Sequence, residues 1–321
     1  MPKNLLVSII IPAHNAENYI RRAIESALNQ TYKNIEIFVI DDGSTDNTAK
    51  IIKSYKDPRI IYLYQENGGQ GKARNYAISK STGKYITFLD ADDIYLPEKV
   101  EQEAKFLIAN PKYKIAYCDM LHFYADKPDK FFRKKYQYYS GDILENLLDS
   151  VFLNLSTVMI SRELWNNVIK SLSERRYYSE DWEMFLKIAV SGFLFGYVNK
   201  DLVKVEVRRD SITRLENQWI VKENAIEIFK KILPQIPKGK FDSKQIKKII
   251  KKMEFKLAIA YLVVGKKKEF YKIFIYLLNQ PFRIFLQIPA IALIATPSFI
   301  LEPLLKKVWL LNQIRNSQNE E

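Results

Sequence analysis

The sequence has little cysteine and little histidine, and each shortage excludes a kind of site. The single Cys118 cannot form an intrachain disulfide, which fits a reducing compartment. Two histidines, His14 and His122, are too few for a zinc site built on histidine. A signal peptide is not expected either, because the apolar run at residues 5–11 is short and polar residues follow it at once. These shortages predict a protein of the cell interior without a leader.

Composition predicts a globular chain with an unusual distribution of charge. The 321 residues are 47% hydrophobic and 27% charged, which suits one large domain or two. The net charge of +13 lies mostly in residues 222–321, which hold 19 Lys and Arg against 8 Asp and Glu. A basic tail of this kind binds nucleic acid or an anionic membrane, or is simply the solvated face of helices.

Four apolar runs in the first 90 residues predict buried strands. They cover residues 6–11, 35–40, 60–64 and 84–89, and a helical pattern follows each of them. Strands that alternate with helices imply a mostly parallel central sheet with helices on its faces. We therefore expect an α/β fold in this half of the chain.

Polar loops follow three of these strands, at Pro12–Asn15, Asp41–Asp46 and Asp90–Asp93. The carboxyl ends of parallel strands lie at one edge of a sheet, where such folds bind their ligands, so the three loops should converge. Asp90, Asp92 and Asp93 are close enough to repel one another unless a cation lies between them. Oxygen ligands suit Mg²⁺ or Mn²⁺, with diphosphate oxygens completing the shell. The alternative is a solvated acidic turn.

The loop after the third strand, residues 67–75, is rich in glycine but is not a dinucleotide fingerprint, because the G-x-G-x-x-G spacing is absent. Its glycines let backbone approach a ligand closely. Lys72 and Arg74 beside them are candidate phosphate contacts, and the alternative is that both are surface residues at the start of a helix.

These four motifs stand in the order and spacing of family 2 glycosyltransferases, which the chain resembles over residues 5–215. The resemblance implies a GT-A fold, an α/β domain that binds a nucleotide sugar. It also implies that Asp42 contacts the nucleobase and that Pro12, Ala13 and Glu17 line the nucleoside pocket. Asp90 would contact the ribose, and Asp92 would bind the metal with help from Asp90. The role of Asp93 stays open. Many members have a histidine near the point where this chain has Arg209 and Asp210, so the third contact of the metal or diphosphate is open. Arg208 and Arg209 are our candidates for binding the diphosphate directly, and Arg209 is the one that we name as a site residue.

Glu180 and Asp181 begin a second informative stretch, at the start of a predicted helix. By itself, such a pair is an acidic first turn that the helix dipole favours. The family resemblance implies that Asp181 is the general base for the acceptor hydroxyl and that Glu180 orients the acceptor or the loop. Direct displacement without a covalent intermediate would invert the anomeric configuration.

The predicted function is transfer of a sugar from a nucleoside-diphosphate sugar to a hydroxyl of a glycan or a lipid-linked acceptor in polysaccharide biosynthesis, with Mn²⁺ or Mg²⁺. The resemblance alone implies UDP as the nucleotide. One alternative is a nucleotidyltransferase of similar fold, although that chemistry needs basic residues that the loop at residues 12–15 does not have. The other is a non-catalytic protein that binds membrane or nucleic acid through the basic tail. That reading leaves the acidic loops unexplained, so nucleic acid is not an expected partner.

The predicted organisation is a catalytic domain at 1–221, with donor binding in 1–110 and the acceptor side in 111–221. A helical hairpin at 222–280 and an apolar segment with a polar tail at 281–321 would follow. Residues 284–301 carry no charge, but Pro289 and Pro297 divide them, and basic residues stand on both sides. We expect a peripheral or monotopic enzyme on the cytoplasmic side of the membrane, bound to anionic lipid. A soluble cytoplasmic enzyme is the second choice, and the sequence does not indicate the oligomeric state.

Overall fold

The structure is a computed structural model that describes residues 5–134, 137–150, 152–175, 179–208 and 217–278. The chain divides into two compact units, Met1–Arg208 and Arg209–Glu321, whereas the sequence pattern suggested a boundary at 221. Each unit is described by itself below. The predicted apolar segment and tail at 281–321 lie outside the described residues.

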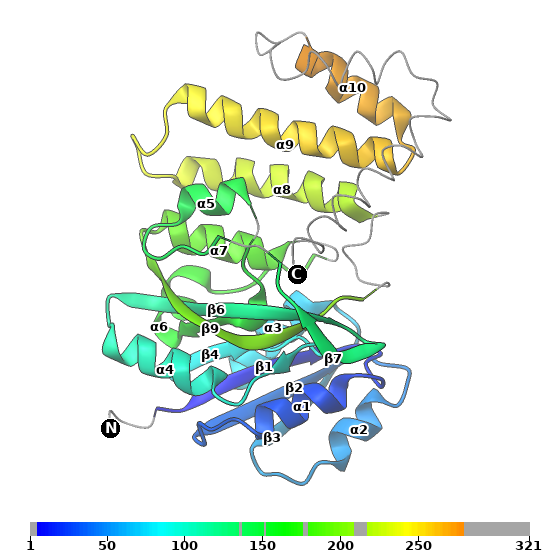
Figure 1. Ribbon diagram of the computed structural model, residues 1–321, viewed down its shortest axis with the longest axis vertical. Helices are drawn as coiled ribbons and strands as arrows, with labels where there is room; N and C mark the ends of the chain where they lie inside the picture. The colour runs from blue at the N-terminus through cyan, green and yellow to red at the C-terminus, as the bar shows by residue number, and fades with distance from the viewer. Residues whose placement is uncertain (1–4, 135–136, 151, 176–178, 209–216, 279–321) are drawn as a thin grey trace. The chain divides into compact units, whose positions relative to one another are not determined.

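The first unit contains a nine-stranded sheet flanked by helices (Figure 1). Its strands are β1 (Val7–Ala13), β2 (Ile35–Asp42), β3 (Ile60–Gln65), β4 (Tyr85–Phe88), β5 (Ile94–Tyr95), β6 (Tyr113–Tyr124), β7 (Lys127–Phe132), β8 (Val158–Ser161) and β9 (Leu194–Glu206). Its helices are α1 (Ile20–Leu28), α2 (Thr48–Ser54), α3 (Gln70–Lys80), α4 (Lys99–Ala109), α5 (Leu144–Asp149), η1 (Leu155–Thr157), α6 (Arg162–Leu164), η2 (Trp165–Ile169) and α7 (Glu180–Val190).

The sheet has a parallel half and a mixed half. Strands run in the order β3-β2-β1-β4-β8-β6-β9-β5, and β7 pairs with β6 beside this path. The four predicted strands form the parallel half, β3-β2-β1-β4, and the predicted α/β class is confirmed. The antiparallel strand β8 then joins β4 to β6. This order places the carboxyl ends of β1, β2 and β4 next to one another.

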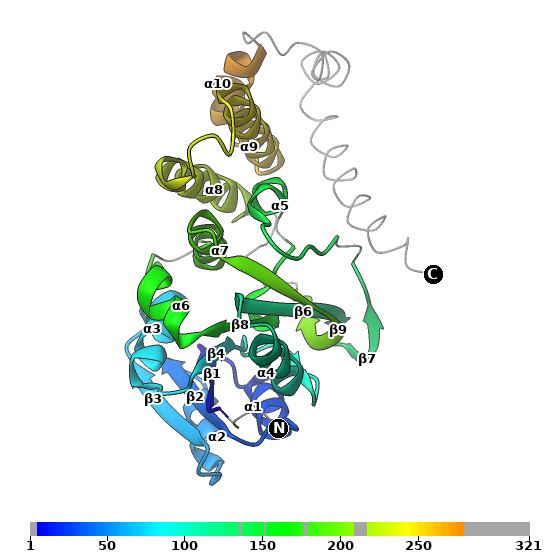
Figure 2. The ribbon, with the colours of Figure 1, turned by 90° about the vertical axis from the view of Figure 1, so that its left-hand side faces the viewer.

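Helices cover both faces of the parallel half because its strands are apolar on both faces. Along β1, Val7, Ile9 and Ile11 pack in one cluster with apolar residues of α1, such as Ile24. Ser8 and Ile10 alternate with them and are also buried. Figure 2 shows the sheet nearly edge-on, with α3 and α6 on one side and α1, α2 and α4 on the other. The core therefore consists of three layers, with the loops of the site at one edge.

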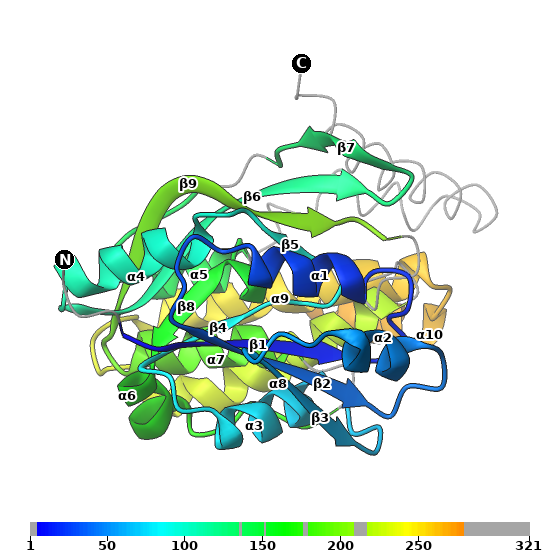
Figure 3. The same ribbon diagram turned by 90° about the horizontal axis from the view of Figure 1, so that it is seen from below.

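Strands β6 and β9 form a long parallel pair that the sequence pattern only partly predicts. The apolar run at 115–118 suggested a short strand, but β6 continues to Tyr124 and pairs with β9 as far as Glu206. Strand β7 returns along the end of β6 as a hairpin (Figure 3). The pair matters for the site because β9 ends beside the acidic loop.

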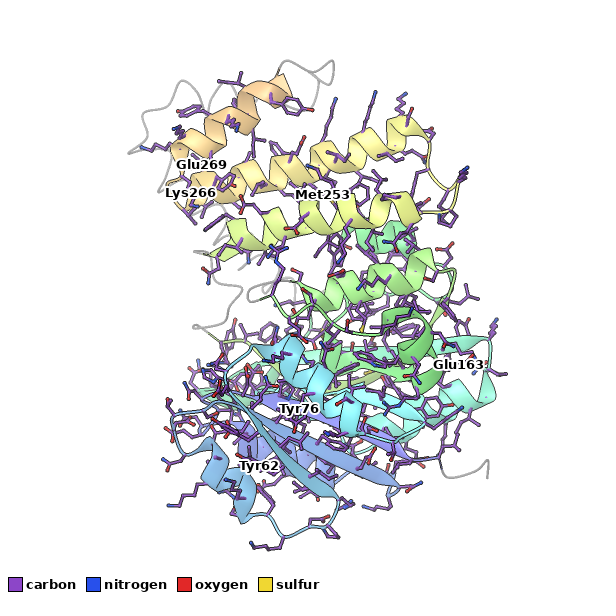
Figure 4. All side chains as sticks on the ribbon, turned by 180° about the vertical axis from the view of Figure 1, so that it is seen from behind. Tyr62, Tyr76, Glu163, Met253, Lys266 and Glu269 are labelled. Carbon is purple, nitrogen blue, oxygen red and sulfur yellow. The ribbon has the colours of Figure 1, made fainter. Side chains whose placement is uncertain are left out.

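The second unit contains α8 (Gln218–Ile232), η4 (Leu233–Gln235), α9 (Ser243–Val263) and α10 (Lys267–Leu278). Helix α9 begins with a capping box between Asp242 and Gln245 and packs against both α8 and α10. At the α9–α10 turn, the Lys266 ammonium lies 3.1 Å from the centre of the Trp219 ring, and Lys266 is labelled in Figure 4. This contact joins the start of α8 to the start of α10.

Candidate active site

The loops after β1 and β2 converge as predicted and are held together by side chains. The His14 ring Nδ1 lies 2.8 Å from the Asp42 carbonyl oxygen. The Asn15 side chain accepts a hydrogen bond from the Thr45 amide at 2.8 Å. Glu17 Oε2 accepts two bonds from Asn47, one from its backbone and one from its side chain. Glu17 therefore binds the start of α2, next to Pro12 and Ala13 at the end of β1.

Asp42 is buried at the end of β2 and holds the glycine-rich loop. Its Oδ1 accepts bonds from Gln65 Nε2 at 2.7 Å and from the Gly68 amide at 2.8 Å. Its Oδ2 accepts a third bond, from the Gly69 amide at 2.9 Å. A carboxylate offers about four acceptor positions, so two are occupied by the loop and a third by Gln65 at the end of β3. The predicted nucleobase contact would use the position that remains.

Close packing against backbone accounts for one of the glycines in this loop, Gly71. A Cβ at Gly71 would lie 2.0 Å from the Ser173 carbonyl oxygen, so α3 approaches that segment only with glycine there. A Cβ at Gly68 would lie 2.5 Å from the side chain of Lys72. Lys72 is exposed and its stem lies along the loop, so a phosphate contact remains a prediction for it.

The three acids after β4 have three different partners. Asp90 accepts a bond from Arg74 at 2.6 Å, and Asp92 pairs with Arg208 at 3.4 Å. Asp93 is buried and accepts bonds from Ser156 Oγ at 2.6 Å and from the Glu206 amide at 3.2 Å. Asp93 therefore fixes the acidic loop to the neighbouring elements η1 and β9.

Two of these acids, Asp90 and Asp92, are accessible enough to bind a cation. Asp90 and Asp92 have side chains that are 31% and 30% exposed. Burial, and then the charge of Asp90, raise the pKa of Asp92 to about 6, although Arg208 opposes the shift. Within the described ranges, no group of three or more His, Cys, Asp or Glu is placed to hold a metal. Two carboxylates fit a hard cation only if diphosphate oxygens supply the other ligands.

Arg74 is buried rather than exposed, and it connects two parts of the site. Its guanidinium donates to Asp90 Oδ1 at 2.6 Å and to Glu180 Oε1 at 2.7 Å. Neither alternative from the sequence, an open phosphate contact or a surface residue, describes this geometry. The sequence indicated Arg74 as a site residue but did not predict its ion pairs with two carboxylates.

Glu180 and Asp181 begin α7 as predicted, and burial changes the acidity of both carboxyl groups. Glu180 is 4% exposed, and burial raises its pKa to about 7 although Arg74 lowers it. Burial also raises the pKa of Asp181, which is half-buried and accepts a bond from the Trp182 amide at 2.7 Å. A carboxylate of raised pKa is a stronger base, which suits proton removal from a hydroxyl.

Sequence reasoning missed one member of the site. Ser156 accepts a bond from the Asp90 amide at 3.0 Å and donates to Asp93, so it fixes both ends of the acidic loop. Arg208 was one of the two arginines that the sequence suggested for the diphosphate. Its guanidinium lies 4.4 Å from the centre of the Tyr19 ring and faces Asp92. Arg209, the other candidate, lies outside the described residues.

Residues 8–165 match the family model described as Glycosyl transferase family 2. The chain therefore carries a domain of glycosyltransferase family 2. An uncharacterized glycosyltransferase of Rickettsia typhi is 40% identical over 197 residues, which are 60% of this chain and 61% of that protein. TuaG of Bacillus subtilis, named as a putative teichuronic acid biosynthesis glycosyltransferase, is 29% identical over 71% of this chain and 88% of that protein. The chain thus spans about three fifths of the Rickettsia protein's length.

Solved structures of similar fold confirm the GT-A prediction. S. aureus TarS 1–349 in complex with UDP-GlcNAc has a TM-score of 0.67 at 18% identity and covers 86% of this chain and 81% of that chain. The mannosyltransferase PcManGT from Pyrobaculum calidifontis, in complex with GDP-Man and Mn²⁺, has a TM-score of 0.57 at 17% identity. It covers 98% of this chain and 88% of that chain. At these identities the likeness shows the fold alone.

Proposed function

We propose that this protein is an inverting, metal-dependent transferase that moves a sugar from a UDP-sugar to a hydroxyl of a glycan or a lipid-linked acceptor. The observation that carries the proposal is the position of Arg74. It brings Asp90, on the predicted donor side, and Glu180, on the predicted acceptor side, to one guanidinium. Direct displacement at the anomeric carbon requires the groups that bind the donor and the groups that bind the acceptor to be neighbours.

Each carboxylate has a separate role in this proposal. Asp92 and Asp90 would hold Mn²⁺ or Mg²⁺, which would supply positive charge to the leaving diphosphate. Asp181 removes the proton of the acceptor hydroxyl, and Glu180 orients the acceptor or the loop. Arg208, beside Asp92, is placed for a diphosphate oxygen, a role that the sequence suggested for Arg208 or Arg209. Asp42, Pro12, Ala13 and Glu17 form the proposed nucleoside pocket.

The site of action is also a proposal. No helix within the described residues is long and apolar enough to cross a membrane. The uncharged stretch at 284–301 lies outside those residues, so peripheral attachment at the cytoplasmic face of the membrane remains a prediction from the sequence. The printed name of TuaG supports a glycan polymer as the acceptor class.

The test is a donor screen that scores hydrolysis of UDP- and GDP-sugars with Mn²⁺, with Mg²⁺ and with EDTA. We expect metal-dependent hydrolysis of a UDP-sugar. A proton NMR time course should show that the free sugar is released with inverted anomeric configuration. Asp181→Asn keeps the shape of the side chain but accepts no proton, and should lower the rate of transfer about 10²–10⁴-fold. Donor affinity should change little. Hydrolysis at the same rate in EDTA, or transfer by Asp181→Asn at the wild-type rate, would contradict the proposed mechanism.

A further inference from the structure

Helix α9 in the second unit has one face made almost entirely of lysine. The six residues recur at intervals of three and four positions, which places them on one side of a helix. They are Lys244, Lys247, Lys248, Lys251, Lys252 and Lys256, and all are exposed except Lys251, which is half-buried. At 1.5 Å per residue, this lysine face is about 18 Å long.

The opposite face of α9 is apolar and packed within the unit. Met253, Leu257 and Ala260 are buried, and α9 contacts both α8 and α10. In Figure 4, side chains with nitrogen tips project from the edge of α9 that lies away from α8, and Met253 is labelled on the same helix. The orientation of α9 is therefore fixed by its core, and the lysine face is turned to solvent.

Helix α9 itself contributes few acids beside these lysines. Asp242 is engaged in the capping box at the start of α9, and Glu254 is half-buried with Lys230 and Lys251 nearby. Glu254 and Asp242 are the only acids in residues 242–263, which hold all six lysines. Like charges along one face repel one another, so an extended anionic partner would stabilise the folded unit in the bound state.

Exposed apolar side chains accompany the lysines. Phe255 lies within the lysine face and is 39% exposed. On α10, Tyr271, Ile275 and Tyr276 are 47%, 55% and 50% exposed, and Lys268 and Lys272 share their side of the helix by spacing. Lysine mixed with aromatic residues is the composition of helices that lie at a lipid interface, where the rings enter the headgroup region.

We propose that the lysine face of α9, with Phe255, binds the headgroups of an anionic lipid bilayer. A bilayer fits better than nucleic acid because phosphate contacts account for the lysines but leave the exposed Phe255 and the apolar side chains of α10 without a role. This surface is distinct from the stretch at 284–301, and its binding does not depend on the catalytic proposal. It gives the second unit a function of its own, which is to hold the chain at a membrane surface.

The test uses the full chain with vesicles of phosphatidylglycerol and phosphatidylcholine, and with vesicles of phosphatidylcholine alone. The variant is Lys247→Gln/Lys248→Gln/Lys252→Gln, because glutamine keeps good helix propensity. Each lysine near an anionic surface contributes about fivefold, so the partition coefficient in co-sedimentation should fall roughly 100-fold. The matched control, Lys50→Gln/Lys53→Gln/Lys56→Gln, removes the same charge from the first unit and should bind as the wild type does. Equal thermal midpoints for all three proteins show that folding is intact.

Three outcomes would overturn the proposal. The first is equal binding by both triple variants, which would assign attachment to another segment. The second is equal binding to both kinds of vesicle. The third is binding to a DNA duplex that requires the α9 lysines while vesicle binding does not. Phe255→Ser separates the partners further, since it should weaken vesicle binding and leave any DNA binding unchanged.

Discussion

Asp90 and Glu180 bind the same guanidinium, that of Arg74, from positions that are 90 residues apart in the sequence. Asp90 follows β4 in the acidic loop, and Glu180 is the first residue of α7. Only arginine offers several donors in a fixed planar fork, so one side chain can hold two carboxylates in a defined geometry. Arg74 therefore fixes the distance between the proposed donor and acceptor groups.

Arg74→Lys should lower kcat about 10²-fold, because one ammonium cannot keep both carboxylates in place and small misplacements are costly. The thermal midpoint should change less, since lysine keeps the positive charge. Arg59→Lys is the control, because Arg59 forms its ion pair with its neighbour Asp57 and also donates to the Leu28 carbonyl, and neither of these residues belongs to the proposed site. Near wild-type kcat in Arg74→Lys would mean that the two ion pairs serve folding alone.

Local patterns were sufficient to predict the parallel half of the sheet. Its strands are short apolar runs bounded by turn residues, and the edge where their loops meet follows from parallel topology alone. The contacts between Asn15 and Thr45 and between Glu17 and Asn47 confirm that convergence. The prediction that Asp90 and Asp181 belong to one site followed from the family resemblance and not from spacing, whereas Arg74 was a candidate because it stands beside the glycine-rich loop.

Interactions distant in sequence explain what was missed. The extension of β6 depends on β9, which pairs with it about 80 residues later, and no local pattern contains that partner. Ser156 follows no motif, and its role appears only when η1 meets the acidic loop.

Asp92→Asn should abolish metal-dependent turnover and leave the fold intact, because the amide keeps the volume of the side chain but loses its charge. Binding of Mn²⁺ in the presence of UDP, followed by electron paramagnetic resonance, should weaken at least tenfold, since charge is the main attraction of a hard cation. Asp126→Asn, in the exposed turn between β6 and β7, is the control. Unchanged Mn²⁺ binding in Asp92→Asn would remove this residue from the proposed metal site.

The rate should fall as the pH decreases through about 7. Burial raises the pKa of Glu180 to about 7, well above its ordinary value of 4.5, so its charge is lost below that pH. Protonation of Glu180 removes the ion pair with Arg74. Burial also raises the pKa of Asp181, so the proposed base takes up its proton at a higher pH than an exposed aspartate does. In Glu180→Gln the midpoint of the acid limb in a kcat–pH profile should move to lower pH. A midpoint that stays in place would assign the limb to another group.

Lys99 and Glu103 form an ion pair beneath the acidic loop in which neither side chain is exposed, and the distance between Nζ and Oε2 is 2.9 Å. Lys99 also donates to Thr87 Oγ1, while the Tyr95 hydroxyl donates to the Phe88 carbonyl, so the cluster supports the end of β4. Lys99→Met leaves a buried carboxylate without its partner and should cost about 3–5 kcal/mol of unfolding free energy.

The double variant Lys99→Met/Glu103→Leu tests that reason, because it replaces the pair with apolar groups of similar size. It should recover most of the stability in a chemical denaturation series. The loss in Lys99→Met should also depend on pH with a defined sign. Burial already raises the pKa of Glu103 to about 7, above its ordinary value of 4.5. Removal of Lys99 raises it further, so the folded state keeps the proton at pH 5 and loses stability as the pH rises toward 9. A deficit that is equal at both pH values would show that lost packing, and not the unpaired charge, causes the destabilisation.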